Sequence, residues 1–349
     1  MFKQITINGR KIGPDYAPYI IAEMSANHNG SIDKAFKIIE EAKKAGADAL
    51  KLQTYTADTI TLKSDHDDFK IKDGLWAGQS LYDLYESAHT PWDWHAPLFD
   101  YARKLGITIF SSPFDNTAVD LLESLNAPAY KIASFEAIDL SLIRYVASTG
   151  KPMIISTGMA NDDEIQEAIN AAYEGGCKEL AILHCVSGYP APAADYNLRT
   201  LLDMSQRFQL ITGLSDHTLD NTTAIASVAL GASIIEKHFT LDRNGGGADD
   251  SFSLEPADMK QLCHGAKNAW QALGRVDYGR KSSEQGNAKF RRSLYFVSDL
   301  KSGQIITVND VRSIRPGFGI PPKYLDKVIG AVVTIDVQHG TAVQFDHLA

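Results

Sequence analysis

The sequence predicts an α/β fold: a (β/α)8 barrel, the TIM barrel architecture, followed by a small β-rich domain. Eight short apolar runs alternate with helix-like segments, and polar side chains gather where those runs end. The final residues, 290–349, instead form four short strand-like runs divided by glycine and proline, SLYFV, QIITV, AVVTI and AVQF. Strands that alternate with helices are typical of parallel α/β sheets, and eight such units are typical of a closed barrel.

The elements of the barrel follow one another in a regular rhythm. A ribbon at residues 4–12 alternates around Asn8-Gly9, the usual hairpin signal, and we expect it to close one end of the barrel. The predicted strands are residues 19–23, 49–53, 108–112, 129–134, 153–157, 180–185, 210–213 and a last run that ends in Glu236, Lys237 and His238. The predicted helices are residues 32–45, 92–104, 116–125, 141–148, 162–174, 198–207, 221–230 and 256–273, and residues 54–90 form a long insertion.

Composition limits the class of protein and its partners. Of the 349 residues, 44% are hydrophobic and 22% charged, which is ordinary for a globular protein, and the net charge of −9 comes with no basic tract. We therefore expect no nucleic-acid partner. No apolar run approaches the ~20 residues that span a bilayer, and the N-terminus lacks the apolar core of a signal peptide, so we expect no membrane segment and a cytoplasmic location. The three cysteines show no CxxC spacing and are interpreted as reduced thiols.

The domain organisation is predicted from the change of pattern near residue 277. We expect a catalytic barrel with its N-terminal hairpin over residues 1–276. A polar, glycine-containing linker should occupy residues 277–289, and a C-terminal domain residues 290–349. A domain of that size usually leans on a partner surface for stability.

Polar and ionisable side chains lie at the carboxyl ends of the predicted strands, where barrel enzymes carry their active sites. In chain order they are Glu23, Lys51, Gln53, Ser111, Ser112, Lys131, Ser134, Glu136, Ser156, Thr157, His184, Ser215, His217, Glu236 and His238. This concentration predicts an active site on that rim.

The types of side chain on the rim indicate two kinds of binding. Two histidines, His217 and His238, follow neighbouring parallel strands and could hold a divalent ion while leaving positions open for a substrate. Taken singly, each histidine could instead cap its strand. The lysines Lys51 and Lys131, with nearby hydroxyls, suit a small phosphate or carboxylate, although a lone lysine at a strand end could also be a solvated charge.

The sequence resembles the sialic acid synthase family, phosphoenolpyruvate-dependent nonulosonate synthases with a (β/α)8 barrel and a C-terminal antifreeze-like (SAF, β-clip) domain. The segments that carry the resemblance are IIAEMSANHNGS, KLQ, SSPFD, YKIASFE, ISTGM, GLSDHT and EKHFT. IRPGFG, residues 314–319, resembles the arginine loop of the small domain, which in the family reaches the partner's barrel in a domain-swapped homodimer. The resemblance therefore implies a homodimer.

Within this family, residues 68–95 and EMSANHNG look more like the pseudaminic acid branch than the N-acetylneuraminate branch. The neuraminate branch has an asparagine two residues before a tyrosine, and this chain has Ser187 before Tyr189. The implied substrates are phosphoenolpyruvate and 2,4-diacetamido-2,4,6-trideoxy-L-altrose, and the implied products are pseudaminic acid and phosphate.

The resemblance also assigns roles to the rim. It implies a divalent ion, Mn with Co, Mg or Zn as alternatives, on His217 and His238. It places phosphoenolpyruvate on Lys51, Lys131, Ser112, Ser134, Ser156 and Ser215. The sugar would be held by Glu23, Gln53, Tyr189, Asp249 and Arg315, and the catalytic residues would be Glu136, Glu23 and His238. Glu136 would manage protons or stabilise a cationic centre.

Three alternatives stay open from the sequence. The chain could be an N-acetylneuraminate or another nonulosonate synthase that uses a different amino sugar. It could be a class I aldolase in which Lys51 or Lys131 forms a Schiff base. It could also be a non-catalytic protein whose C-terminal domain binds ice or glycan.

Overall fold

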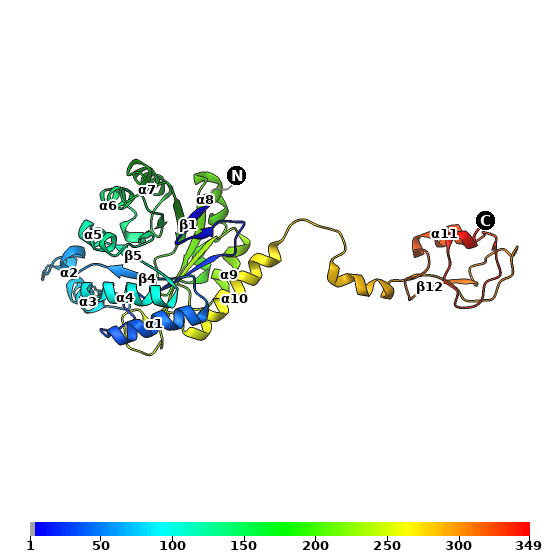
Figure 1. Ribbon diagram of the computed structural model, residues 1–349, viewed down its shortest axis with the longest axis horizontal. Helices are drawn as coiled ribbons and strands as arrows, with labels where there is room; N and C mark the ends of the chain where they lie inside the picture. The colour runs from blue at the N-terminus through cyan, green and yellow to red at the C-terminus, as the bar shows by residue number, and fades with distance from the viewer. Residues whose placement is uncertain (1–3) are drawn as a thin grey trace. The chain divides into compact units, whose positions relative to one another are not determined.

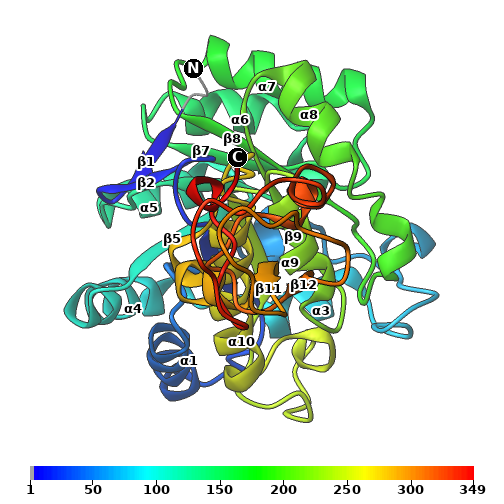
Figure 2. The ribbon, with the colours of Figure 1, turned by 90° about the vertical axis from the view of Figure 1, so that its right-hand side faces the viewer.

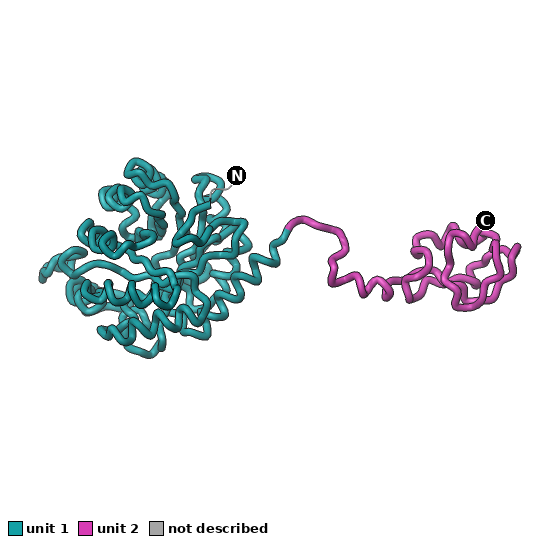
Figure 3. The backbone as a smooth tube through the Cα atoms, viewed as in Figure 1, with its two compact units in different colours: residues 1–274 teal, residues 275–349 magenta. Residues whose placement is uncertain are grey.

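The computed structural model describes residues 4–349 and divides into two compact units, residues 1–274 and residues 275–349 (Figure 3). The first unit contains the predicted barrel and the second contains the β-rich segment. The sequence-based limits of the linker, 277–289, and of the last domain, 290–349, stay a prediction.

The first unit is a closed barrel of eight parallel strands, which confirms the predicted fold class (Figures 1 and 2). The strands are β3 (Tyr19–Glu23), β4 (Ala49–Thr54), β5 (Thr108–Pro113), β6 (Tyr130–Ile132), β7 (Met153–Ser156), β8 (Leu180–Cys185), β9 (Ile211–Asp216) and β10 (Ile234–His238). They pair in chain order, and β10 closes on β3 with Ile234 opposite Tyr19. The register sets His238 opposite Glu23, and Glu23 opposite Lys51.

Helices surround the barrel at nearly the positions that the sequence predicts. They are α1 (Ile32–Ala45), α4 (Trp92–Leu105), α5 (Asn116–Ser124), α6 (Leu140–Ala147), α7 (Asp162–Glu174), α8 (Thr200–Phe208), α9 (Thr222–Ala229) and α10 (Pro256–Leu273). Local chemistry sets their ends: the Ser31 hydroxyl accepts a hydrogen bond from the Lys34 amide at the start of α1, and Gly46 ends that helix with a φ of 96°. A serine suits the first position because its hydroxyl satisfies a free backbone N–H group, and glycine suits the second because it adopts a positive φ without a clash of a Cβ atom.

The insertion after β4 contains structure that sequence analysis did not predict. It forms α2 (Ala57–Ile60), a 3₁₀ turn at Asp67–Phe69 and α3 (Leu81–Ala88). These elements are short, so their apolar periodicity is too brief to be read from sequence.

The interior of the barrel changes from apolar to polar along its axis. The hairpin β1 (Ile5–Ile7) and β2 (Arg10–Ile12) packs Ile5, Ile7 and Ile12 against inward-facing residues of the strands, so it closes the amino-terminal end of the barrel as predicted. That inner cluster also contains Tyr19, Ile21, Ala49, Phe110, Ala129, Ile154, Ala181, Leu183, Ile211 and Ile234. A separate cluster fills the layer between strands and helices. The carboxyl-terminal half of the interior is therefore left to polar side chains.

The second unit has its own apolar core around Leu294, Phe296 and Val343. It contains β11 (Ser293–Phe296), β12 (Val311–Ile314) and α11 (Leu325–Val328), preceded by a 3₁₀ segment at Ser282–Phe290. Of the predicted strands, the first corresponds to β11. The runs near residues 305, 332 and 342 form isolated bridges rather than strands, and β12 was not predicted. Frequent glycines and prolines keep these segments too short for regular ladders.

No helix among residues 4–349 combines the length and the apolar character that a membrane crossing requires.

Candidate active site

Strand periodicity decides which rim residues point into the barrel. Successive side chains of a strand point to opposite faces, so residues two apart share a face. Ala49 and Ile211 belong to the inner cluster, and therefore Lys51 on β4 and Ser215 on β9 also point inward. The same counting places Glu236 on β10 inside, two residues after Ile234.

Two lysines and two glutamates form a buried charged cluster inside the barrel. The Lys51 Nζ lies 2.7 Å from Glu23 Oε2 and donates to the Ser112 hydroxyl at 3.2 Å. Glu236 Oε1 lies between the two lysines, 3.3 Å from Lys131 Nζ and 3.7 Å from Lys51 Nζ. All five side chains are buried. Because opposite charges alternate, the cluster can hold its charges away from water.

The surroundings shift the pKa of each member. Burial raises the pKa of Glu23 although Lys51 opposes the shift. For Lys51, burial lowers the pKa, but the attraction of Glu23 and Glu236 outweighs it and the pKa is raised. Burial opposes ionisation of Glu236 as well, yet its two lysine neighbours lower its pKa. Burial lowers the pKa of Lys131, with Glu236 only partly offsetting it. We therefore take Lys51 as an ammonium and Glu236 as a carboxylate.

Three serines that the sequence assigned to phosphoenolpyruvate differ in how they are engaged. The Ser215 hydroxyl donates to Glu236 Oε1 at 3.3 Å, and the Ser134 hydroxyl accepts a hydrogen bond from the Gly158 amide at 3.1 Å. The Ser156 hydroxyl is buried and has no hydrogen-bond partner among the described residues. Since buried polar groups are normally paired, Ser156 is available for a ligand atom.

Glu136 lies in the short 3₁₀ turn Ser134–Glu136 that follows β6. Burial raises its pKa to about 7, and the nearby Lys131 lowers it only in part. Its Oε2 is buried without a partner among the described residues. A carboxyl group that titrates near neutral pH can accept or hold a proton under working conditions.

His217 and His238 face one another at the rim. Their ring centroids are 5.4 Å apart, and the Nδ1 of His217 lies 2.8 Å from the Val186 carbonyl oxygen. The buried Nδ1 of His238 has no hydrogen-bond partner among the described residues. Across residues 4–349, no group of three or more His, Cys, Asp or Glu side chains could hold a metal ion. An ion on this pair would therefore take its other ligands from substrate or water.

Polar side chains expected to bind the sugar lie beside the charged cluster. The Gln53 amide donates to Glu23 Oε1 at 3.1 Å and to the Ser25 hydroxyl at 3.0 Å. The Ser25 hydroxyl in turn donates to Asp249. Tyr189 lies over His217, with ring centroids 4.4 Å apart. Gln53, Glu23, Asp249 and Tyr189 thus belong to one connected region.

Two predicted positions lie elsewhere. His184 was included among the rim residues, but on β8 it alternates with Leu183 of the inner cluster and so points out of the barrel, where its Nε2 contacts the Tyr196 carbonyl. Arg315, expected to bind the sugar, belongs to the second unit, directly after β12.

Sequence reasoning did not assign several residues that contribute to this region. Glu236 was seen on the rim but given no role, although its spacing from His238 already placed both on one face. Ser25 and Phe252 were not considered, and Trp76 was considered only as a residue that could pack in the core or at a dimer interface, without a role in the site. Trp76 donates its indole N–H to the Ala248 carbonyl at 3.0 Å, and its ring centroid is 6.0 Å from that of Tyr189. No local pattern signals such contacts, because their partners are far away in the sequence.

A closed barrel with buried lysines and a histidine pair at the carboxyl ends of its strands, in a chain with a second, small β-rich unit, has the architecture of a barrel enzyme with its site on that rim. The NeuB family model matches residues 38–278, and the SAF domain model matches residues 291–349. The chain belongs to the NeuB family, which confirms the resemblance read from its motifs.

Individual relatives agree with this family. The pseudaminic acid synthase of Campylobacter jejuni is 42% identical over 332 residues, covering 95% of this chain and 96% of that protein. The pseudaminic acid synthase of Helicobacter pylori is 40% identical, covering 95% of this chain and 98% of its own. The crystal structure of N-acetylneuraminic acid synthetase from Leptospira borgpetersenii has a TM-score of 0.73 at 29% identity, over 83% of this chain and 97% of that one.

Proposed function

We propose that this enzyme condenses phosphoenolpyruvate with 2,4-diacetamido-2,4,6-trideoxy-L-altrose to give pseudaminic acid and phosphate. One observation carries the proposal: buried amines and a histidine pair occupy the same rim of the barrel in a chain about two-fifths identical to pseudaminic acid synthases. The reaction joins the methylene carbon of phosphoenolpyruvate to the sugar aldehyde. Water then adds to the neighbouring cationic carbon, and phosphate leaves with cleavage of its C–O bond.

Phosphoenolpyruvate binds at the lysine end of the site. Lys131 has only Glu236 as an ion-pair partner among the described residues, so its remaining N–H groups can donate to phosphate or carboxylate oxygens. Lys51, held as an ammonium, adds a second positive charge. The remaining phosphoenolpyruvate ligands are the hydroxyls of Ser112, Ser134, Ser156 and Ser215, and the unpaired Ser156 hydroxyl supports this assignment.

A divalent metal ion fits the histidine pair. The donors are soft enough for Mn, Co or Zn, and the unpartnered Nδ1 of His238 is a buried donor in need of a partner. When bound, the ion would withdraw charge from the aldehyde oxygen of the sugar. His217 and His238 would hold it.

The chain's own side chains orient the sugar and control protons. Gln53, Glu23 and Asp249 offer amide and carboxylate groups to sugar hydroxyls and amides, and Tyr189 offers a ring face. Glu136, with its raised pKa, stabilises the cationic carbon as a carboxylate and receives the proton of the incoming water. Glu23 assists from the buried cluster.

Phosphate release from phosphoenolpyruvate tests this function directly. The enzyme with Mn²⁺ is incubated with 2,4-diacetamido-2,4,6-trideoxy-L-altrose and, in parallel, with N-acetylmannosamine. We expect phosphate release with the trideoxy sugar. Release driven by N-acetylmannosamine instead would establish the neuraminate alternative, and release with neither sugar would contradict both.

A class I aldolase that uses Lys51 is disfavoured by the ion pairs of this residue. Schiff-base formation needs a neutral amine, and the pKa of Lys51 is raised by its glutamate neighbours. Lys131, whose pKa burial lowers, is the other candidate for a Schiff base, and borohydride trapping in the presence of substrate tests it. We expect no covalent adduct; a trapped adduct on Lys131 would establish the aldolase alternative.

We further propose that the enzyme works as a cytoplasmic, domain-swapped homodimer in which Arg315 of one chain reaches the sugar in the partner's barrel. The resemblance of residues 314–319 to the family's arginine loop supports this assembly.

A further inference from the structure

Lys237 is a buried cation that the proposed reaction does not use. It lies on β10 between Glu236 and His238, and because those neighbours point into the barrel, Lys237 points outward. Its side chain is 1% exposed. A buried ammonium is costly unless its hydrogen bonds are satisfied. Its position therefore requires explanation.

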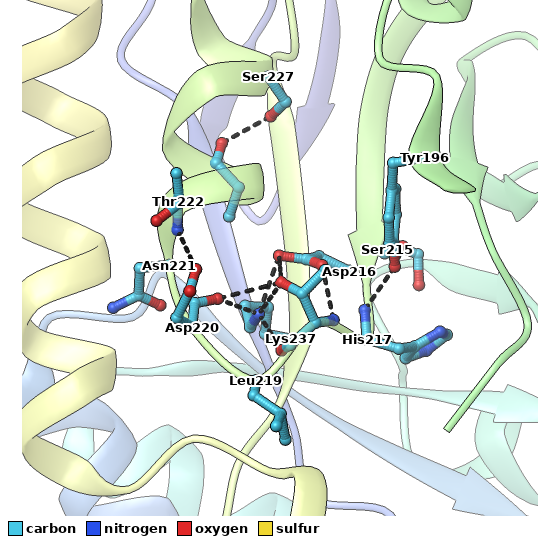
Figure 4. Close-up of polar contacts among 12 residues, drawn as sticks. Tyr196, Ser215, Asp216, His217, Leu219, Asp220, Asn221, Thr222, Ser227 and Lys237 are labelled. Atoms are coloured by element: carbon cyan, nitrogen blue, oxygen red, sulfur yellow. Dashed lines mark hydrogen bonds and ion pairs between the residues drawn. The ribbon is translucent and has the colours of Figure 1, made fainter. Parts of the chain in front are cut away.

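The Lys237 ammonium binds the loop that carries His217. Its Nζ lies 2.8 Å from Asp216 Oδ2 and donates to the backbone carbonyls of Thr218 and Asp220, each at 2.7 Å. Asp216 and Thr218 are the residues on either side of His217. Figure 4 shows the amine of Lys237 among these groups, while the His217 ring points away from it. The Asp216 carboxylate also accepts from the Thr218 amide at 2.9 Å, which tightens the turn.

The other contacts of His217 come from the opposite side. Its amide donates to the Tyr196 hydroxyl at 2.6 Å, and its Nδ1 lies 2.8 Å from the Val186 carbonyl. Both partners belong to segments between β8 and α8. The side chain of Lys237 thus ties the backbone after His217 to β10, the strand that ends in His238, beyond the point where the pairing of β9 with β10 stops at Asp216.

We propose that Lys237 is a positioning residue that fixes His217 relative to His238 and thereby sets the affinity of the pair for a divalent cation. This inference rests on the metal site of the proposed function. Metal affinity demands ligand positions accurate to about 0.2 Å, so a loop released on one side weakens binding. Groups behind the ligands commonly change metal affinity by about 10- to 100-fold.

The test is the dissociation constant of Mn²⁺ alone for Lys237→Met, measured by electron paramagnetic resonance on full-length enzyme stripped with chelator. We expect it to rise by about 10- to 100-fold, while circular dichroism stays that of the wild type. Lys151→Met is the matched control. It removes a lysine that pairs with Glu123 at 2.7 Å elsewhere on the barrel, and we expect its dissociation constant to change by less than about twofold.

A folded Lys237→Met enzyme that binds Mn²⁺ as tightly as the wild type would overturn the inference and leave the metal site standing. If Lys237→Met does not fold, Asp216→Asn decides. This change keeps the shape of the side chain and one of its oxygens but removes the charge. We expect the dissociation constant of Mn²⁺ to rise by at least about threefold, and an unchanged constant would overturn the inference. A wild-type chain that binds no Mn²⁺ would refute the metal site itself, and this inference with it.

Discussion

At the scale of single residues, the site separates three glutamates by their surroundings. Glu236 is a carboxylate because it lies between two lysines. The pKa of Glu136 is instead raised to about 7, because burial outweighs the attraction of Lys131. Glu23 shares Lys51 with Glu236 and has a raised pKa. Environments that separate the pKa values of like groups are typical of catalytic sites.

Glu136→Gln tests the catalytic assignment. Because the wild-type carboxyl titrates near pH 7 and acts as a carboxylate, kcat should rise as pH increases from 6 to 8. The variant should lose about 10²- to 10⁴-fold in kcat and show no such rise, since glutamine does not titrate. Lys51, Lys131, Asp139 and Tyr85 also face this carboxyl group. Stopped assays of phosphate release at a series of pH values measure how kcat depends on pH.

Glu174→Gln, which changes a carboxylate on α7, is the control and should behave as the wild type. A variant profile that still rises through pH 7 would show that another group is responsible.

The sequence placed most of the side chains that the structure brings together on the rim, because strand ends are easy to find, and their roles stay a prediction. Period-two counting also distinguishes inward from outward side chains, and applied to β8 it would have placed His184 outside. The hydrogen bond from Ser25 to Asp249 could not be foreseen, because it joins residues 224 positions apart.

At the scale of elements, the insertion between β4 and α4 contributes a side chain to the region that we propose binds the sugar. Trp76 joins the Ala248 carbonyl to the Tyr189 ring, and Ala248 precedes Asp249. The hydrogen bond and the ring contact are each worth about 1 kcal/mol. Together they are worth about 2 kcal/mol, so Trp76→Ala should raise the KM for the sugar by about 30-fold and leave the KM for phosphoenolpyruvate unchanged.

Trp92→Phe is the matched control for Trp76. The Trp92 indole also donates to a backbone carbonyl, that of Tyr55 at 3.2 Å, but no ring stacking with Tyr189 is present. It should leave both KM values near those of the wild type. If Trp76→Ala raises the KM for the sugar and the KM for phosphoenolpyruvate equally, Trp76 does not act on sugar binding alone.

The N-terminal hairpin packs against the apolar, amino-terminal end of the barrel interior and closes it. Ile7 is fully buried in the inner cluster, so Ile7→Ala should lower the free energy of unfolding of the barrel by about 2–5 kcal/mol. Thr6→Ala, on the other face of β1, should change it by less than about 0.5 kcal/mol. Denaturant titrations of the full chain measure both. Equal stabilities would mean that the hairpin does not pack as described.

Elements with long periodic patterns were predicted well, and short ones were not. The apolar repeat over residues 256–273 gives α10 with the expected limits, because Pro256 starts it and Gly274 follows it. By contrast, β12 and α2 each span four residues, which is too few for a period to stand out.

At the scale of the whole molecule, the proposed assembly makes each active site from two chains. His217→Ala inactivates a barrel and Arg315→Ala inactivates a small domain, so each homodimer alone should be inactive. After equal mixing and subunit exchange, about half of the dimers are mixed and each has one intact site, which predicts about a quarter of wild-type activity. Phosphate release by the mixture measures it. A mixture that stays inactive while mass spectrometry detects mixed dimers would contradict the exchange.

The sequence predicted both folding units because their patterns differ: regular βα alternation in one and glycine- and proline-divided runs in the other. The proposed contribution of the second unit to the site would be a property of assembly and would depend on more than local pattern. The assignment of Arg315 to the site therefore rests on family resemblance alone. The assignment of Lys51, Lys131, His217 and His238 is also supported by the closed barrel, which brings these residues to one rim.

A crystal structure of the enzyme with Mn²⁺ and phosphoenolpyruvate tests the central claim most directly. We expect an anomalous manganese peak between the rings of His217 and His238, and the phosphate and carboxylate of the ligand against Lys51 and Lys131. A manganese peak away from both rings, or a ligand bound at the opposite end of the barrel, would contradict it.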